Sequence, residues 1–472
     1  MLDALDPPRT RDLVPGPARS GGRYVAYLVD AAQRAHHNPA LEEALHLGRA
    51  LDLPVVAAFA LDAHEPGLNA RSAAYLLDGL VDLQGALAAR GVGFAVRYAD
   101  PTTLAHALAP DAAALVLDRG YLRHQRAWRA RLAREAPLPI REVEGDVVVP
   151  VETVTDKREW AARTIRPKLW RHAEAFLVRP DAQPVAVPAD AVALADGLPP
   201  VELADLGTVL AHLDLDDRAA PVAAEVGGER AADARFERFL ADRFAAYAAH
   251  RNQPQTDDVS HLSKALRYGH LSVVDVALRA REAARDAASL EAFLEELVVR
   301  RELAINFVAF SGDYDAYATL PPWARTTLAE HADDAREVTY DAATFEAART
   351  HDPYWNAAMR EMRATGYMHN YMRMYWGKKV LEWTPDPETG FELLRTLNDR
   401  WFLDGRSPNG YAGVAWTFGL HDRAWTERAV FGKVRYMNAN GLKRKADPDA
   451  YVAKVARLEA DAHAADATRF RP

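Results

Sequence analysis

Hydrophobic positions follow two different periods along the chain, and the change of period divides it. The first part holds short apolar runs at residues 24–29, 53–59, 92–96 and 114–117. Amphipathic stretches separate or follow them at residues 40–51, 70–90 and 121–135. Buried strands that alternate with helices of this length are typical of a parallel sheet covered by helices. The pattern predicts an α/β domain with a Rossmann-like sheet over residues 1–180.

The pattern changes twice more. Residues 181–230 show little periodicity and contain Pro184, Pro188, Pro199, Pro200 and Pro221. This composition predicts a long connector over the surface, and a partly disordered linker fits it equally well. Beyond residue 231, apolar residues recur every three or four positions, as in Phe236, Phe239 and Leu240. We therefore expect a larger all-helical domain over residues 231–472.

Composition narrows the function classes. Hydrophobic residues make up 49% and charged residues 26% of the chain, as in an ordinary globular protein. No apolar run is long enough to span a bilayer, and residues 1–6 lack the features of a signal peptide, so a cytoplasmic protein is expected. The absence of cysteine excludes disulfides and thiolate metal sites, and we predict no metal centre.

Net charge and short motifs say little about the partners or the cofactor of the protein. The net charge of −9 weakly disfavours nucleic acid as a partner, although a local basic patch can reverse the sign. Neither a G-x-G-x-x-G motif after the first strand nor a phosphate-binding G-x-x-x-x-G-K-[ST] motif occurs. The sequence therefore predicts no standard dinucleotide or P-loop site in the first domain.

Tryptophan is concentrated near the C-terminus. Seven of the ten tryptophans follow residue 320, at positions 323, 355, 376, 383, 401, 416 and 425. Trp376 and Trp383 lie seven residues apart on a helix predicted over residues 369–382, which puts both rings on one face about 10 Å apart. This spacing suits an electron-hopping relay as well as it suits core packing.

Longer motifs carry a resemblance to a known family. The segments 350–358 (THDPYWNAA), 366–376 (GYMHNYMRMYW), 397–411 (LNDRWFLDGRSPNGY) and 431–438 (FGKVRYMN) resemble the class II cyclobutane pyrimidine dimer photolyases. The similarity continues at residues 32–34, 118–123, 147–152 and 299–304, so that only the connector and the two ends lie outside it. The resemblance implies light-driven repair, in which excited reduced FAD donates an electron to a dimer flipped out of DNA.

The resemblance also implies a cofactor site in the helical domain. Tyr247 and the run Leu262, Ser263, Lys264, Ala265 and Leu266 match the region that holds the FAD phosphates and ribityl chain. Asn398 would face flavin N5, and Arg373 with Asp404 would form a buried ion pair beside the ring, with Gly405, Asn409 and Gly410 nearby. Considered without the family, Ser263 is a helix N-cap, Asn398 ends a helix, and the ion pair ties two helices together.

The relay implied by the family consists of Trp376 nearest the flavin, Trp355 from the preceding helix, and Trp383 toward the surface. We assign Trp323, Trp401 and Trp425 to core packing only. Relay and repair need no general base or nucleophile, in keeping with the absence of a recognisable catalytic triad.

DNA contacts are implied at three places. Glu296 would contact the flipped pyrimidine, with Met374 and Trp416 as an apolar wall. Arg251 matches a position near the lesion, and Arg300 stands where some relatives carry tryptophan. The cations Lys433, Arg435, Lys443, Arg444 and Lys445 form a basic segment that is either a DNA-contacting loop or a solvated surface.

Two other activities are compatible with the same fold. A cryptochrome-like flavin photoreceptor would keep the cofactor and the relay without repairing DNA. Repair of (6-4) photoproducts would call for a histidine pair in the lesion pocket, and no motif places one there. In this family the N-terminal domain commonly holds an antenna chromophore, often of deazaflavin type, and no short motif in this sequence decides which antenna is present or whether there is one. The protein is expected to act as a monomer without an obligate protein partner.

Overall fold

The N-terminal part is built on a six-stranded sheet, seen in a computed structural model that describes residues 3–189, 194 and 197–464. The strands lie in the order β1-β6-β5-β2-β3-β4, and all neighbours are parallel except β1 and β6. Their bounds are β1 Thr10–Val14, β2 Tyr24–Leu28, β3 Val55–Leu61, β4 Gly93–Tyr98, β5 Ala112–Asp118 and β6 Ile140–Val143. The predicted Rossmann-like sheet is confirmed, and the order of its parallel strands reverses between β2 and β5.

The strands β1 and β6 were not predicted from the sequence. The edge strand β1 is partly exposed, and β6 reads Ile-Arg-Glu-Val, with two charges in four residues. The charges of β6 are buried because they are paired: Arg141 bonds to Glu43, and Glu142 pairs with Arg11 at 2.5 Å. Ion pairing therefore replaces the apolar pattern that marks the other strands.

Helices cover both faces of the sheet. On one face lie α1 (Pro39–Leu51) and α2 (Ala70–Ala89), and on the other α3 (Pro101–Leu108) and α4 (Arg123–Glu135). Alternate residues of β2 face the two layers: Val25 and Tyr27 pack in the α1–α2 core, and Tyr24 and Ala26 in the α3–α4 core. The short α3 was not predicted.

The predicted connector closes the open edge of the sheet. Pro200 forms an isolated antiparallel bridge with Arg97, and Val201 donates its N–H to the Val96 carbonyl at 3.0 Å. The connector then forms α7 (Leu206–Leu213), and residues 190–193, 195 and 196 lie outside the described residues. The connector thus covers the carboxyl end of β4, part of an edge that could otherwise pair with other chains.

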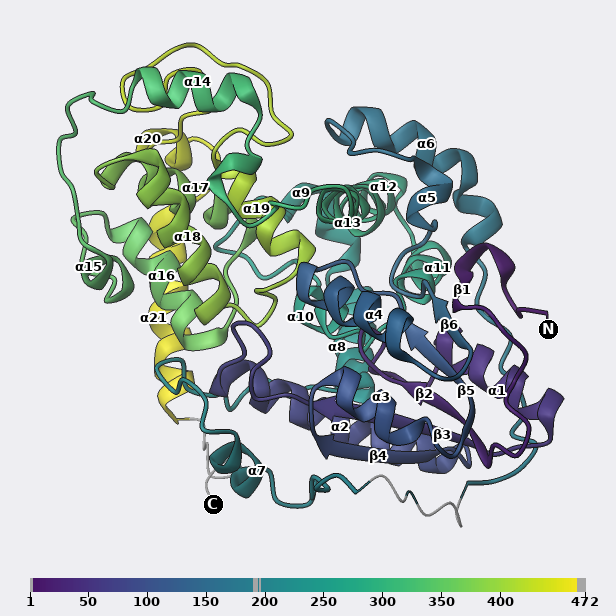
Figure 1. The fold of residues 1–472 in the computed structure, drawn as a ribbon. Coiled ribbons are helices and arrows are strands. Elements are labelled where there is room, and N and C mark those ends of the chain that lie inside the picture. Colours follow the sequence, from purple (N-terminus) through teal and green to yellow (C-terminus); the bar gives the residue numbers. More distant parts are fainter. Residues whose placement is uncertain (1–2, 190–193, 195–196, 465–472) are drawn as a thin grey trace.

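The remainder of the chain is helical, as predicted. After α5 (Val151–Val154) and α6 (Ala162–Phe176), the helical part contains α8 Glu229–Asp242, η2 Phe244–Ala246, α9 Tyr247–His250, α10 Ser263–Arg267, α11 Val273–Ala283, α12 Ala287–Leu294, η3 Glu295–Arg300, α13 Arg301–Ala309, η4 Tyr317–Thr319, α14 Pro322–Glu330, α15 Ala342–Glu346, α16 Pro353–Thr365, α17 Asn370–Trp383, α18 Pro387–Trp401, α19 Pro408–Thr417, α20 Ala439–Lys443 and α21 Pro448–Ala464. Figure 1 shows this part beside the sheet and its helices. Although α6 falls within residues 1–180, its apolar face packs with α8 and α11 in the helical core.

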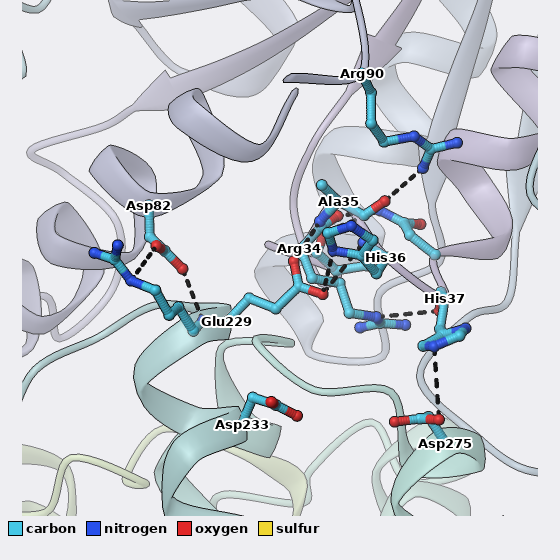
Figure 2. A network of polar contacts seen from close by, with 12 residues as sticks. Arg34, Ala35, His36, His37, Asp82, Arg90, Glu229, Asp233 and Asp275 are labelled. Carbon is cyan, nitrogen blue, oxygen red and sulfur yellow. Dashed lines mark hydrogen bonds and ion pairs between the residues drawn. The ribbon is translucent and has the colours of Figure 1, made fainter. Parts of the chain in front are cut away.

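Polar contacts, some of them buried, join the two parts. In Figure 2, Glu229 at the start of α8 accepts hydrogen bonds from the backbone N–H groups of Ala35 (2.9 Å) and His36 (3.3 Å), and His37 pairs with Asp275 of α11 at 3.6 Å. On α2, the buried Arg71 guanidinium donates to carbonyls at the ends of α16 and α18, those of Met362 (3.1 Å) and Trp401 (3.0 Å). Because helix ends carry unpaired carbonyls, Arg71 caps two helices of the other part.

Among the helices of the described residues, none combines the length and hydrophobicity that a bilayer crossing requires.

Candidate functional site

A cavity of about 530 Å³ lies at the carboxyl ends of the parallel strands, where the strand order reverses. Asp30 after β2, Asp62 after β3 and Arg119 after β5 line it from the sheet. From the helical part, its lining includes four residues predicted to bind the cofactor: Ser263, Leu266, Asp404 and Asn409. Ligands of open α/β sheets bind at such a reversal point, so the fold places a cavity where one is expected.

The predicted ion pair between Arg373 and Asp404 is present. One guanidinium nitrogen of Arg373, on α17, lies 2.9 and 3.0 Å from the two carboxylate oxygens of Asp404. The side chains are 24% and 11% exposed, and the Arg373 guanidinium lies 3.9 Å above the centre of the Phe402 ring. The pair therefore holds its charges in a fixed place at the edge of the cavity.

Asn398 lies in the last turn of α18 and is buried. Its amide nitrogen donates to the Asp399 carboxylate at 2.9 Å. Two glycines approach it closely: a Cβ on Gly405 would lie 2.6 Å from the Asn398 carbonyl oxygen, and one on Gly410 would lie 3.0 Å from the amide nitrogen. Only glycine allows this approach without a shift of the backbone or of the amide.

The three tryptophans of the predicted relay contact one another. The ring of Trp355, on α16, lies 6.5 Å from that of Trp376 and 6.1 Å from that of Trp383, both on α17. The Trp355 indole also donates to the Trp376 carbonyl at 2.9 Å. Trp355 thus stands between the other two, and we call these three residues the relay.

The two ends of the relay differ. The Trp376 ring lies 6.0 Å from Phe402, the ring on which Arg373 stacks, and its indole nitrogen is buried without a hydrogen-bond partner among the described residues. Trp383 was expected toward the surface, but it is only 4% exposed. It borders the exposed His351 at 4.9 Å, so the relay stops one residue short of solvent.

The segment predicted to hold the cofactor phosphates is largely buried. Tyr247 packs edge-to-face on Phe239 and Phe293, and Leu262, Ala265 and Leu266 are buried. The N-cap of α10 is Leu262, and Ser263 is its first helical residue, so the alternative interpretation of Ser263 as an N-cap is wrong. The Lys264 ammonium is buried against Glu225 of the connector at 2.5 Å, and burial lowers its pKa.

A second cavity, of about 330 Å³, was not predicted. It lies between α8, α16, α21 and the segment before α10, and its lining includes Arg243, Ser260, His261, Tyr367 and Lys454. His261 bonds to Asp257 at 2.8 Å, and burial nonetheless lowers its pKa. Ser260 and His261 directly precede the predicted Leu262–Leu266, so extending that segment by two residues would have found part of this cavity.

Two of the predicted lesion contacts, Glu296 and Arg251, meet at a π-helical turn, η3. Glu296 of this turn bonds to Arg251 at 2.6 Å, and both side chains are partly exposed. Met374 and Trp416 are partly buried, as a pocket wall requires. Arg300 is directed to Glu295 at 3.0 Å. Single π-helical turns inside helices are frequent at functional sites.

The predicted basic segment is partly neutralised by internal pairs. Arg435 bonds to Asp422 at 3.0 Å and Lys433 lies 3.8 Å from Glu427, while Lys443 lies 5.5 Å above the Tyr354 ring. We call residues 433–445 the basic loop. Arg435 remains 37% exposed at its side chain, which leaves it accessible to a second anion.

One core assignment is wrong. Trp425 is 39% exposed, and its ring lies 4.5 Å from the Arg435 guanidinium and 5.0 Å from that of Arg423. Cation–π contacts in a loop hold the indole at the surface, and hydrophobic periodicity carries no sign of them. Trp401 is 7% exposed, as expected of a core residue.

Comparisons with known proteins agree with this geometry. The DNA photolyase family model matches residues 25–189. A deoxyribodipyrimidine photo-lyase of Methanothermobacter thermautotrophicus is 43% identical over 438 residues, which cover 92% of this chain and 95% of the relative. Another, from Oryza sativa, is 40% identical over 95% of this chain and 90% of its own length.

Solved structures share the fold. A class III photolyase of Agrobacterium tumefaciens superimposes with a TM-score of 0.71 at 18% identity, covering 93% of this chain and 88% of that one. A cryptochrome of Synechocystis superimposes with a TM-score of 0.67 at 18% identity, covering 91% and 87%. At such identities the solved structures show the fold alone. The relatives that are 40–43% identical over most of both chains show the family: the chain belongs to the DNA photolyase family.

Proposed function

We propose that the protein repairs cyclobutane pyrimidine dimers in DNA under light, in the manner of class II photolyases. The observation that carries the light-driven flavin chemistry of the proposal is the relay, a line of three contacting indoles whose inner end lies beside the Arg373–Asp404 pair. Phe402 joins the two features, since both Trp376 and Arg373 contact its ring. Relatives at 34–43% identity bear the name deoxyribodipyrimidine photo-lyase, which supports the same activity.

The residues present fit FAD as the cofactor. The unpartnered indole N–H of Trp376 is a buried donor that a cofactor acceptor would satisfy, as buried polar groups require. Gly405 and Gly410 leave room at Asn398 that a side chain would fill. Tyr247 and Leu262–Leu266 would hold the phosphates and ribityl chain, and Arg373, Asn398, Asp404, Gly405 and Asn409 would surround the ring. When bound and reduced, FAD supplies the photoexcited electron that opens the dimer.

The chain's own residues would orient the cofactor, exclude water and deliver electrons. Asn398 can serve as hydrogen-bond donor or acceptor, so it can follow a change of protonation at the neighbouring atom. The Arg373 cation favours negative charge beside it. The relay would carry an electron inward from Trp383 through Trp355 to Trp376, which keeps the cofactor reduced and is separate from repair.

The lesion would be held at η3 and by the basic loop. Photolyases are among the enzymes that act on a nucleotide flipped out of the duplex. Glu296 would accept hydrogen bonds from the flipped pyrimidine, with Arg251 holding its carboxylate, and Met374 and Trp416 would pack against the dimer. Arg435 and Lys443 would contact phosphates, and the exposed Trp425 between two guanidinium groups suits stacking on a base.

We further propose that the sheet side of the larger cavity takes an antenna chromophore of deazaflavin type. Trp128 and Tyr121 line that side and offer flat apolar surfaces for a ring system. One structure of similar fold, an archaeal photolyase of Sulfolobus tokodaii, is described as holding two FAD molecules, with the implication of a novel light-harvesting cofactor.

The test uses purified protein reconstituted with FAD and an oligonucleotide that carries one thymine dimer. We expect the flavin spectrum to stay with the protein through gel filtration, and the dimer to be lost under blue light but not in the dark. Protein that stays colourless with added FAD contradicts the cofactor. Flavin-loaded protein that photoreduces but leaves the dimer intact contradicts repair and favours a cryptochrome-like photoreceptor.

A further inference from the structure

An exposed basic face on α6 has no part in the function proposed so far. Trp160, just before the helix, is 51% exposed, the largest exposure among the exposed aromatic side chains. Arg163 and Arg171 are exposed on α6, and no ion pair joins either of them to another described residue. Arg166 lies between them and pairs with Glu295 at 2.7 Å. We call Trp160, Arg163, Arg166 and Arg171 the α6 face.

The charge of this segment opposes that of the whole protein. Residues 156–176 contain six Lys or Arg and three Asp or Glu, whereas the chain carries a net charge of −9. Two of the three acids are already paired, Glu159 with Lys168 and Glu174 with Arg281. The exposed cations therefore produce a local positive field that attracts a polyanion.

The α6 face is continuous with the candidate lesion site through two contacts. His421 donates a hydrogen bond from Nδ1 to the Trp160 carbonyl, 2.8 Å away, because a carbonyl oxygen can only accept. His421 directly precedes Asp422, the partner of Arg435. Figure 1 shows the same proximity, with α6 reaching toward the loop that follows α19.

The second contact runs through η3. Glu295 binds Arg166 of α6 at 2.7 Å and Arg300 at 3.0 Å, and the next residue, Glu296, binds Arg251. Arg166 of the α6 face and the predicted lesion contact Arg251 therefore form ion pairs with adjacent residues of the same π-helical turn.

Resting on the proposed function, we propose that the α6 face is a second DNA-contact surface, which binds the strand flanking the lesion. Arg163 and Arg171 are two helical turns apart, about 12 Å along the axis, which spans roughly three or four base pairs. Each would neutralise one phosphate, and Trp160 would pack on a sugar or an unpaired base.

Other partners fit the face less well. On α6, Ile165 and Leu169 are buried in the helical core, and Trp170 and Phe176 are partly buried against it. The helix therefore offers no wide exposed apolar face for a membrane. One exposed indole is also too little apolar surface for a stable contact between protein subunits.

The test compares the variant Arg163→Ala/Arg171→Ala with wild-type FAD-loaded protein. Affinity for a dimer-containing duplex of about 20 base pairs, two helical turns, is measured at several salt concentrations. We expect the slope of log K against log salt to become shallower by about 1.8, because each lost phosphate contact removes about 0.9. Affinity for a dimer-containing strand of about five nucleotides, too short to reach α6, stays unchanged.

The matched control is Arg49→Ala/Arg134→Ala, which removes the same charge from exposed positions of α1 and α4. An equal change of slope in this control would show a general effect of charge and overturn the proposal. Trp160→Ala should weaken duplex binding about fivefold, and Arg163→Lys/Arg171→Lys should keep the wild-type slope.

Failure of this inference can be told apart from failure of the proposed function. Unchanged duplex affinity in the Arg163→Ala/Arg171→Ala variant, with light-driven repair intact, contradicts the α6 face alone. Loss of self-association in sedimentation, with DNA affinity unchanged, would likewise overturn it and identify a subunit contact. Wild-type protein that binds FAD but repairs no dimer contradicts the proposed function.

Discussion

The relay and the basic loop lie in the same domain and are held in place by opposite means. The three indoles of the relay are at most 4% exposed and are fixed by packing and one indole–carbonyl hydrogen bond. The basic loop is fixed by exposed or partly exposed ion pairs, such as Arg435 with Asp422. Packing keeps inter-ring distances constant, as electron transfer requires, whereas an exposed ion pair can exchange one anion for another, as DNA binding requires.

This difference predicts how the effects of substitutions in the two regions depend on salt concentration. Buried contacts are little screened by ions, while exposed charges are screened within about 10 Å at moderate ionic strength. Changes in the relay should therefore have effects that do not vary with salt, and changes in the basic loop should have effects that do.

Replacing Trp355 by Phe should abolish light-driven reduction of the cofactor. The substitution removes the indole between Trp376 and Trp383, the only bridge between them that the aromatic contacts of the described residues provide. Loss of the indole volume should lower the free energy of unfolding by about 1–2 kcal/mol. Absorption changes during illumination measure the reduction.

The control is Trp401→Phe, which removes another buried indole of the same domain and should leave photoreduction intact. Trp355→Phe protein that is first reduced chemically should still repair dimers. Photoreduction at the wild-type rate in Trp355→Phe would contradict the relay.

Lys378 lies on α17 between two residues of the relay, and its charge interacts with that of Arg435 in the basic loop. Burial lowers its pKa to about 7, with opposing influences from Asp422 and Arg435. In the unfolded chain the pKa is about 10.4, so above pH 7 the unfolded state binds more protons and stability rises with pH. From pH 7 to 9.5 this group should add about 3 kcal/mol, an increase that is lost again as the pH falls.

Denaturant unfolding of wild-type protein and of Lys378→Met at both pH values measures this contribution. The variant should lack most of the rise. An identical rise in both proteins would show that Lys378 is already neutral, or paired, throughout this range.

Arg373→Ala should lower the free energy of unfolding by about 2 kcal/mol, because it leaves the Asp404 carboxylate partly buried and unpaired. The pair is partly exposed, which keeps the cost below that of a fully buried one. FAD retention on gel filtration should fall as well. Arg281→Ala, which breaks the more exposed pair with Glu174, should cost under about 1 kcal/mol and keep FAD.

Arg435→Ala should weaken lesion binding several-fold at low salt without loss of FAD, and make the salt slope shallower by about 0.9. Asp422→Asn should act in the opposite sense, since it releases Arg435 for phosphate. Titrations of a dimer-containing oligonucleotide at several salt concentrations measure both, and unchanged affinity across the series would reject the role of Arg435.

The sheet could be predicted where strands are apolar on both faces, as in β2, β3 and β5, because a run of buried residues leaves a plain mark in the sequence. It could not be predicted at β6, where Arg141 and Glu142 are buried through ion pairs with residues far along the chain. Contacts between distant segments, such as Arg71 at the ends of α16 and α18, leave no local pattern either.

The candidate site also has features that the sequence predicts and features that it does not. Helical spacing predicts that Trp376 and Trp383 share a face, but only the fold brings Trp355 between them. The Arg373–Asp404 pair came from the resemblance, and the structure supplies its geometry. Trp425 was misassigned because burial cannot be deduced for a loop indole whose neighbours are guanidinium groups. Ser260 and His261 were missed because the segment match began at Leu262.

Light-driven repair is tested most directly by following one thymine dimer in a defined oligonucleotide that is incubated with protein carrying chemically reduced FAD. Repaired and unrepaired strands are separated by chromatography after equal times in blue light and in darkness. We predict restoration of the two thymines in the light and none in the dark. Dimers that persist in the light with flavin fully reduced, or that disappear equally in darkness, would contradict light-driven repair by this protein.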